Sequence, residues 1–254
     1  FSLGEVNIGS DHPISVQSMT KTDTRDIEKT VEQINELEMA GCDIIRCAVP
    51  NIDAAKSLKD IILKTKLPIV ADIHFEYRLA LEAIKSGVHG LRINPGNIGQ
   101  KKRIISVVQS AKDSNIPIRI GVNSGSLEKD LLEKYGYPSA DALVESAERH
   151  LSILDELDFK NVKVSVKSSN VNTMIDAYRK LAKKTDVPFH LGVTESGTYE
   201  IGSVKSSIGI GSLISEGIGD TIRVSLTDDP IKEVKMGKNI LKALGHFENG
   251  IELI

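Results

Sequence analysis

The sequence contains little cysteine and few aromatic residues, and it has no tryptophan. Two cysteines in 254 residues cannot form a disulfide scaffold, or a four-cysteine zinc or iron–sulfur site within this chain. With five Phe and five Tyr residues, a platform for stacking nucleic-acid bases is not expected. No apolar run approaches the ~20 residues that a membrane-spanning helix needs.

The charges are nearly balanced. Lys and Arg number 32 and Asp and Glu number 35, so the chain lacks the basic excess of most nucleic-acid-binding proteins. Hydrophobic residues make up 40% of the chain, and no Pro- or Ser-rich linker divides it, so we expect one folded domain over residues 1–254. The chain starts at Phe1 without a signal-peptide pattern, and we interpret it as part of a longer protein.

Short runs rich in Val and Ile alternate with stretches of helical periodicity. Eight runs begin roughly every 30 residues, at 14–17, 44–49, 69–73, 91–94, 116–122, 162–166, 189–193 and 221–226. Helical patterns lie between and after them, at 26–40, 54–65, 77–86, 101–115, 140–157, 171–185, 201–216 and 231–244. This alternation predicts a single α/β domain with the (β/α)8 TIM-barrel fold.

An open doubly wound sheet is the competing architecture. It would normally show about six strands and a Gly-rich turn after the first one. Here the first run continues into Gln17-Ser18-Met19-Thr20, which contains no glycine. We also expect residues 6–13 to form a hairpin that plugs the N-terminal end of the barrel.

Polar residues interrupt seven of the predicted strands, although barrel strands are usually apolar on both faces. Residues two or four positions apart in a strand share a face. The pairs are Asp72 and His74, Arg92 and Asn94, Ser165 and Lys167, Arg223 and Ser225, and Arg119 and Asn123, and the pattern extends to Arg46, Thr194 and Glu195. One such residue alone would usually be a satisfied core or edge group. Seven strands together predict a ligand site at the C-terminal mouth, where barrel enzymes keep their chemistry.

The charges of this predicted site indicate the type of ligand. Five cations (Arg46, Arg92, Arg119, Lys167 and Arg223) stand against two carboxylates (Asp72 and Glu195). Because unpaired buried cations are costly, an anion is expected to complete the site. Arg offers a planar fork of donors that fits phosphate oxygens, which favours a phosphate or diphosphate over a substrate with several carboxylates.

Seven segments together resemble one known family. They are QSMT (17–20), AGCDIIR (40–46), VADIHF (70–75), LRINPGN (91–97), IRIGVNSGS (118–126), VSVKSS (164–169) and LGVTESG (191–197). The sequence resembles the 4-hydroxy-3-methylbut-2-enyl diphosphate synthases of the methylerythritol phosphate route to isoprenoids, from about Val6 to Leu244. The resemblance implies a two-electron reductive ring opening of 2-C-methyl-D-erythritol 2,4-cyclodiphosphate, with loss of water, to a linear allylic diphosphate.

The resemblance also implies a [4Fe-4S] cluster held by three cysteines and a glutamate. In the family these ligands lie in a C-terminal domain beyond the barrel, and Cys42 and Cys47 do not match them, so no cofactor is expected on this chain. A ferredoxin or flavodoxin is implied as electron donor. A homodimer is implied too, with the cluster domain of one subunit over the barrel mouth of the other. The implied location is the bacterial cytoplasm or a plastid-type organelle, without nucleic-acid or membrane partners.

The family's binding residues correspond to the polar positions described above. Those that resemble diphosphate ligands are Arg46, Arg92, Arg119, Asn123, Lys167, Arg223 and Ser225. Those that resemble groups facing the carbon skeleton are Asp72, His74, Asn94, Thr194 and Glu195. Glu195 resembles the family's proton donor, a role that partial burial of a carboxyl group supports. The alternative is a purely structural role, in which Glu195 pairs with Lys167 or Arg223.

Two other functions remain open on the sequence. The chain on its own could be a diphosphate-binding module without turnover. It could also be a pterin-binding barrel of the dihydropteroate synthase type, although five strand-borne cations exceed what a pterin ring requires.

Overall fold

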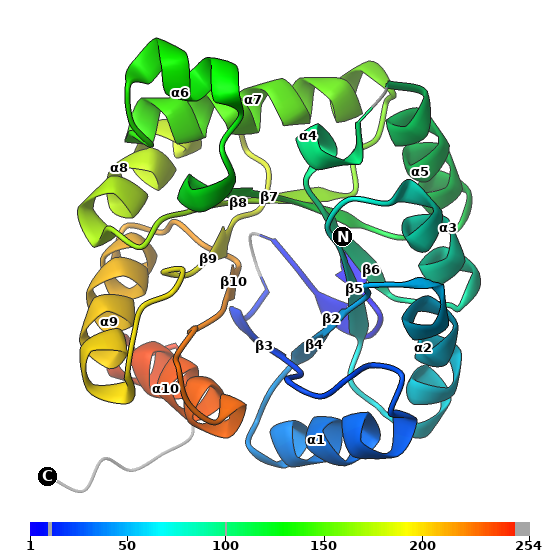
Figure 1. The fold of residues 1–254 in the computed structure, drawn as a ribbon. Helices are drawn as coiled ribbons and strands as arrows, with labels where there is room; N and C mark the ends of the chain where they lie inside the picture. Colours follow the sequence, from blue (N-terminus) through cyan, green and yellow to red (C-terminus); the bar gives the residue numbers. More distant parts are fainter. Residues whose placement is uncertain (10–11, 100, 247–254) are drawn as a thin grey trace, which may run out of the picture.

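The computed structural model describes residues 1–9, 12–99 and 101–246. Eight parallel strands form a barrel that the longer helices surround (Figure 1), which confirms the predicted fold. The barrel strands are β3 (Ser15–Met19), β4 (Ile44–Ala48), β5 (Ile69–Ile73), β6 (Gly90–Ile93), β7 (Ile118–Asn123), β8 (Val162–Lys167), β9 (His190–Leu191) and β10 (Thr221–Ile222). The surrounding helices are α1 (Ile27–Met39), α2 (Ile52–Lys64), α3 (Tyr77–Lys85), α5 (Lys101–Asp113), α7 (Ala140–Glu156), α8 (Val171–Ala182), α9 (Tyr199–Ser215) and α10 (Pro230–Ala243).

The barrel is nearly closed. Strands β3 to β8 pair in sequence order, and β10 pairs with both β3 and β9. A single parallel bridge between Val164 and Phe189 joins β8 to β9. Beside this bridge, the Val164 N–H donates to the carbonyl of Pro188 at 3.0 Å.

The last two strands are shorter than the runs predicted at 189–193 and 221–226. Directly after β9, at Gly192, the two segments approach each other closely. A Cβ atom on Gly192 would stand 2.4 Å from the carbonyl oxygen of Arg223. Glycine in a strand often marks such a close approach of another backbone.

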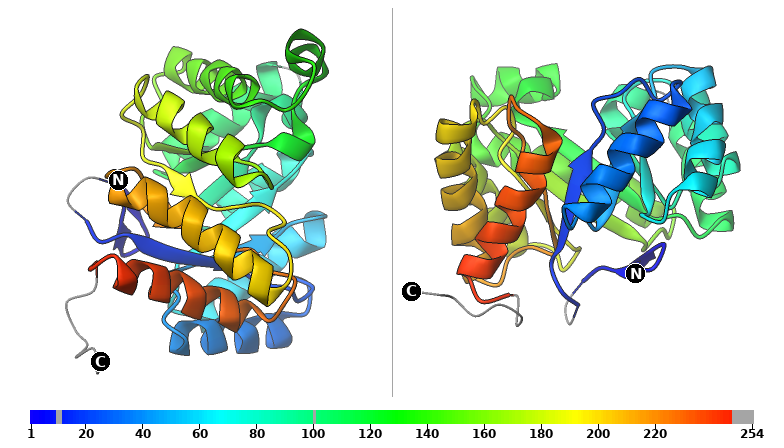
Figure 2. Two further views of the ribbon diagram at one scale, coloured as in Figure 1. Left: turned by 90° about the vertical axis from the view of Figure 1, so that its left-hand side faces the viewer. Right: turned by 90° about the horizontal axis from the view of Figure 1, so that it is seen from below.

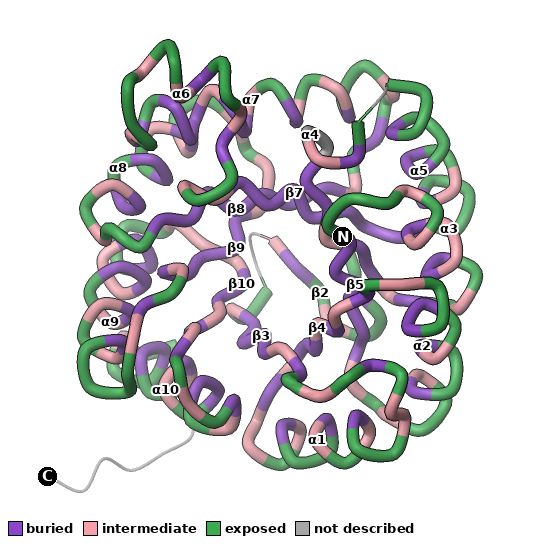
Figure 3. Tube along the Cα trace, viewed as in Figure 1, coloured by how far each residue is buried: buried purple, intermediate pink, exposed green. Residues whose placement is uncertain are grey.

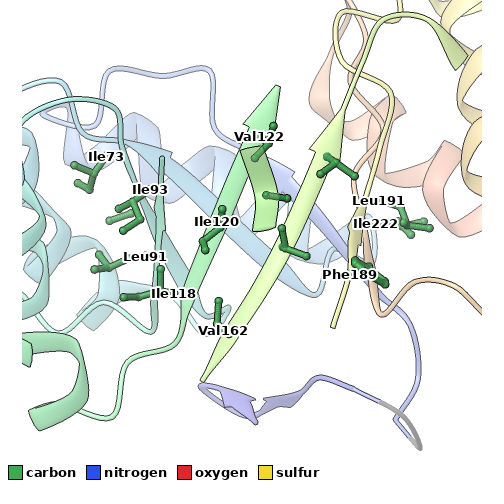
Figure 4. Close-up of a cluster of buried hydrophobic side chains, with 14 of the residues drawn as sticks. Ile73, Leu91, Ile93, Ile118, Ile120, Val122, Val162, Phe189, Leu191 and Ile222 are labelled. Atoms are coloured by element: carbon green, nitrogen blue, oxygen red, sulfur yellow. The ribbon is translucent and has the colours of Figure 1, made fainter. Parts of the chain in front are cut away.

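The main apolar core lies between the strands and the helices, and a smaller apolar cluster packs under the N-terminal hairpin. On β7, Ile118, Ile120 and Val122 are buried in this layer (Figure 4), and the alternate residues Arg119 and Gly121 face the barrel interior. Figure 3 shows the consequence: the barrel strands are mostly buried, and the helices are exposed on their outer sides. The interior is therefore available for polar side chains.

The helices form where local signals and the apolar stripe agree. In α1 the Asp26 side chain accepts a hydrogen bond from the Lys29 N–H, which caps the helix start. Ile34 and Leu37 bury one face against the strands. Gly41, with a φ of 92°, then turns the chain into β4.

The N-terminal hairpin covers one end of the barrel (Figure 2), as predicted, but with different bounds. Its strands are β1 (Ser2–Leu3) and β2 (Val6–Asn7), because the turn is at Gly4, with a φ of 60°. Leu3 and Ile8 pack with Ile44 and Val70 near the starts of β4 and β5. Of the predicted 6–13 hairpin, positions 10 and 11 lie outside the described residues.

Three short helical segments follow β6 and β7, where the sequence analysis assigned no element. They are α4 (Pro95–Ile98), η1 (Ser124–Ser126) and α6 (Lys129–Tyr135). None of the helices in the described ranges combines the length and the apolar character needed to span a membrane.

Candidate functional site

Asp72 lies at the centre of a group of ion pairs near the carboxyl ends of β4, β5 and β6. Its Oδ2 is 3.4 Å from Arg46 Nε, and its Oδ1 is 3.1 Å from Arg92 Nη1. His74 Nε2 lies 3.2 Å from Asp72 Oδ2 and 3.4 Å from Arg92 Nη1. The structure thus brings four of the residues predicted from the sequence together.

Asp72 remains ionised in this setting. Burial opposes the charged form, but the charges of Arg46 and Arg92 and the hydrogen bond with His74 outweigh burial and hold the pKa of Asp72 well below its usual range. One carboxylate therefore compensates in part for two guanidinium groups.

Arg119 and Lys167 form no ion pair of this kind among the described residues. Arg119 is 2% exposed, and its Nε and Nη1 atoms have no hydrogen-bond partner among the described residues. Burial, followed by the charges of Arg119 and Arg223, lowers the pKa of Lys167 well below its usual value. Buried donors without acceptors are what an anion-binding cavity presents before its ligand arrives.

Arg223 has a partner that the sequence analysis missed. Its Nη2 is 3.6 Å from Oε2 of Glu233, a buried residue in the first turn of α10. The other carboxylate oxygen of Glu233 accepts a hydrogen bond from the Leu226 N–H at 2.9 Å. Burial raises the pKa of Glu233. The spacing of α10 marked Glu233 only as a helical position, so no sequence signal pointed to this contact.

Two glycines on the inner face make room for the cations. A Cβ on Gly121 would stand 2.6 Å from Arg92 Nε, and one on Gly192 would stand 2.7 Å from Lys167 Nζ. Any side chain at these positions would have to displace the neighbouring cation. Neither glycine is among the site residues predicted from the sequence.

The open part of the mouth is formed by residues at the end of β7 and after β9. Asn123 Nδ2 donates to Thr194 Oγ1 at 3.2 Å. A pocket of about 310 Å³ is lined here by Arg92, Asn123, Thr194 and Glu195, together with His74. The mouth therefore places neutral donors and one carboxylate next to the cations.

Glu195 has an unusual backbone. It is exposed, and its φ of 48° lies in the left-handed region. A residue other than glycine in this region costs of order 1–3 kcal/mol, and such residues cluster at functional sites. The expected partial burial of Glu195 is not provided by the described residues. Its alternative role, pairing with Lys167 or Arg223, is not supported either, because among the described residues Arg223 pairs with Glu233.

The remaining predicted residues lie close to this group but at different depths. Asn94 is buried directly after β6, and Ser225 is half-buried after β10, where its carbonyl accepts from the Ser196 hydroxyl. Arg119 is the second residue of β7 rather than a late one, and Asn123 is its last. Arg119 still interacts electrostatically with Arg46, Arg92, Asp72 and Arg223, because its side chain lies in the same interior.

A larger hollow, of about 800 Å³, lies elsewhere. Its lining includes Glu148, Phe159, Lys184 and Pro188, around the ends of α7 and α8. Lys184 and Glu148 pair with each other at 2.8 Å. Its two lysines, Lys160 and Lys184, are exposed and paired with carboxylates, so this hollow lacks the uncompensated cations that distinguish the mouth.

Comparison with known proteins identifies the family. Residues 1–238 match the GcpE TIM-barrel domain. The chain is 62% identical over 252 residues to a protein of Clostridium acetobutylicum, and 59% identical over 252 residues to one of Thermodesulfovibrio yellowstonii. Each alignment covers 99% of this chain and 72% of the relative, and both relatives are named 4-hydroxy-3-methylbut-2-en-1-yl diphosphate synthase (flavodoxin). The chain belongs to this synthase family. It contains the barrel domain of an oxidoreductase of isoprenoid biosynthesis, as the sequence resemblance predicted.

Solved structures share the architecture at low identity. Dihydropteroate synthase from Xanthomonas albilineans superposes with a TM-score of 0.62 at 11% identity, covering 92% of this chain and 94% of that one. The 3-dehydroquinate dehydratase of Geobacillus kaustophilus gives 0.65 at 15% identity, covering 98% and 97%. At these identities the likeness concerns the fold alone. Sequence similarity therefore gives no support to the pterin-binding alternative, whereas it shows membership of the synthase family.

The cysteines of this synthase barrel do not fit an iron–sulfur cluster. Cys42 and Cys47 are buried in the layer between strands and helices, away from the mouth, and burial raises the pKa of both thiols to about 12. Among the described residues, no group of three or more His, Cys, Asp or Glu side chains could hold a metal ion.

Proposed function

We propose that the barrel mouth binds the diphosphate of 2-C-methyl-D-erythritol 2,4-cyclodiphosphate through Arg46, Arg92, Arg119, Lys167 and Arg223. The observation that carries this proposal is the buried guanidinium of Arg119, whose Nε and Nη1 have no hydrogen-bond partner among the described residues and whose charge acts on Lys167. The two negative charges of the cyclic diphosphate would supply the acceptors that these donors lack. Asn123 and Ser225 would donate further hydrogen bonds to the same group.

The ring carbons and hydroxyls would then face Asp72, His74, Asn94, Thr194 and Glu195. Asp72 is committed to two arginines, so its role is to orient them rather than to transfer a proton. Glu195 lines the pocket without a competing ion pair among the described residues. It is therefore the candidate that protonates the departing hydroxyl, which leaves as water.

The two electrons of the ring opening must come from outside the residues of this chain. We propose that a [4Fe-4S] cluster supplies them, with ligands in a further domain of the complete enzyme. That domain would cover the mouth from a partner subunit and bring about the burial that Glu195 lacks here. The names of the relatives favour flavodoxin over ferredoxin as the electron donor.

Turnover of the complete enzyme tests this proposal. The full-length protein with reduced flavodoxin should convert the cyclic diphosphate to the linear allylic diphosphate and water. The 254-residue chain alone should bind the substrate without converting it. Failure of the full-length protein to form product from this substrate would contradict the proposed activity.

The close contact between Gly121 and Arg92 yields a further expected result. Gly121→Ala should displace the Arg92 guanidinium and weaken substrate binding roughly 10- to 150-fold, the equivalent of losing a charged hydrogen bond of about 1.5–3 kcal/mol. Gly211→Ala is the matched control, because a Cβ on Gly211 meets no atom within 4 Å. Equal calorimetric affinities for the two variants would show that Arg92 does not bind the substrate.

A further inference from the structure

The barrel interior contains a sixth cation that neither the sequence analysis nor the proposed function uses. Lys163 is the second residue of β8, on the same face of the strand as Lys167. It is 2% exposed, and its Nζ has no hydrogen-bond partner among the described residues. A buried ammonium without a partner is costly, so its protonation depends on what surrounds it.

The charges that act on Lys163 are those of Arg119 and Asp220. On β7, Lys163 is paired in register with Arg119. The charge of Lys163 also acts on His190 of β9, which is fully buried, with Nδ1 at 2.7 Å from Thr221 Oγ1 and with Nε2 unpartnered in the described part of the chain. Before β10 lies Asp220, whose Oδ2 already accepts from the Phe189 N–H at 2.7 Å.

Only some of these groups can change their charge. The cations in the barrel interior repel one another. Because arginine stays protonated in proteins, this repulsion cannot be relieved by proton loss from Arg46, Arg92, Arg119 or Arg223. It can be relieved by proton loss from lysine or histidine. Burial, reinforced by the charge of Arg119, lowers the pKa of Lys163 to about 7 against the weaker opposing effect of Asp220. Burial and the surrounding cations likewise lower the pKa of Lys167 and of His190.

We propose that Lys163 takes up a proton from solvent when a diphosphate enters the mouth, so that anion binding is coupled to charging of the barrel interior. The bound anion compensates the charge of Arg119 and its neighbours, which removes the repulsion that adds to burial in disfavouring the charged form of Lys163. Lys163 is thus a positioning residue that adjusts the charge beneath the ligand without touching it. This inference rests on the proposed function, because it takes the diphosphate as the ligand.

The coupling gives the binding a defined pH dependence. At a pH above the pKa of Lys163 in the free protein and below its pKa in the complex, one proton is taken up per ligand bound. Affinity should then fall up to about tenfold for each unit of rising pH. The cyclic diphosphate has no terminal phosphate, so its own charge does not change near neutral pH.

Calorimetric titration of the chain with the cyclic diphosphate tests the coupling. Near pH 8, titrations in Tris and in HEPES, which differ in ionisation enthalpy, report the number of protons taken up. We expect the wild-type chain to take up at least about one proton. The Lys163→Met variant should take up about one proton fewer on binding. The Lys163→Arg variant should bind the ligand and also take up about one proton fewer, because the arginine is already charged before the ligand binds. Lys59→Met, an exposed control, should match the wild type.

The outcomes separate the two proposals. Binding by the wild type without proton uptake, or equal uptake by wild type, Lys163→Met and Lys163→Arg, would overturn the role of Lys163 and leave the proposed function standing. No binding of the cyclic diphosphate by the wild type would overturn both. If Lys163→Met does not fold, the comparison of wild type with Lys163→Arg decides.

Discussion

Glu195→Gln in the complete enzyme is expected to lower turnover about 100- to 10,000-fold, the range of positioned acid catalysis, while substrate affinity changes little. Gln keeps the size and hydrogen-bonding shape of Glu but cannot deliver a proton to the departing hydroxyl. The melting temperature should not change, because among the described residues Glu195 forms no ion pair with Lys167 or Arg223. Rate, affinity and melting are to be measured on the same preparation.

The control is Glu200→Gln, an exposed carboxylate in the first turn of α9 that should leave all three quantities unchanged. A role for Glu195 in orientation would instead raise the Michaelis constant at a nearly unchanged maximal rate. A Glu195→Gln enzyme that keeps more than about a tenth of the normal rate would rule out the proton-donor role.

Arg119→Met should change stability and binding in opposite directions. Replacement of a buried, uncompensated guanidinium by an apolar side chain should stabilise the empty barrel, because buried charges that are exchanged for hydrophobic groups often yield about 1–4 kcal/mol. For a domain of this size each kcal/mol raises the melting temperature by about 2–4 °C. The same substitution should weaken substrate binding by about 1.5–3 kcal/mol or more, because a charged hydrogen bond to the diphosphate is lost.

Arg179→Met is the matched control on the outer surface. Arg179 pairs with Glu216 on the exposed side of α8, so its loss should lower stability by at most about 1 kcal/mol and leave binding unchanged. A less stable Arg119→Met barrel that binds the substrate normally would show that Arg119 is a structural residue rather than a ligand-binding one. Thermal melting with and without the cyclic diphosphate measures both effects.

The fold could be predicted because it depends on local patterns. Alternation of Val- and Ile-rich runs with helical spacing is visible along the chain, and eight alternations leave few architectures. The hairpin bounds were wrong because the choice between glycine turns, here Gly4, depends on contacts with Ile44 and Val70 rather than on the local sequence. The close approach of the segments after β9 and β10, at Gly192, is likewise a tertiary contact that local patterns do not reveal.

The cationic site could be predicted from strand parity, because alternate residues of a strand must share a face. The other residues of the site contact side chains from different elements, and strand parity does not reveal such contacts. Glu233 comes from a helix, and Gly121 matters only because of the space that Arg92 occupies. Lys163 was accessible to the same parity argument that found Lys167, but it lies at the start of its strand, away from the expected mouth.

A crystal structure of the chain with the cyclic diphosphate bound is the most direct test of the anion site. We predict the diphosphate oxygens within about 2.7–3.2 Å of nitrogen atoms of Arg92, Arg119 and Lys167, inside the C-terminal mouth. A ligand held instead in the hollow lined by Glu148 and Lys184, or one whose diphosphate points away from Arg119, would contradict the central claim that uncompensated cations make this mouth a diphosphate site.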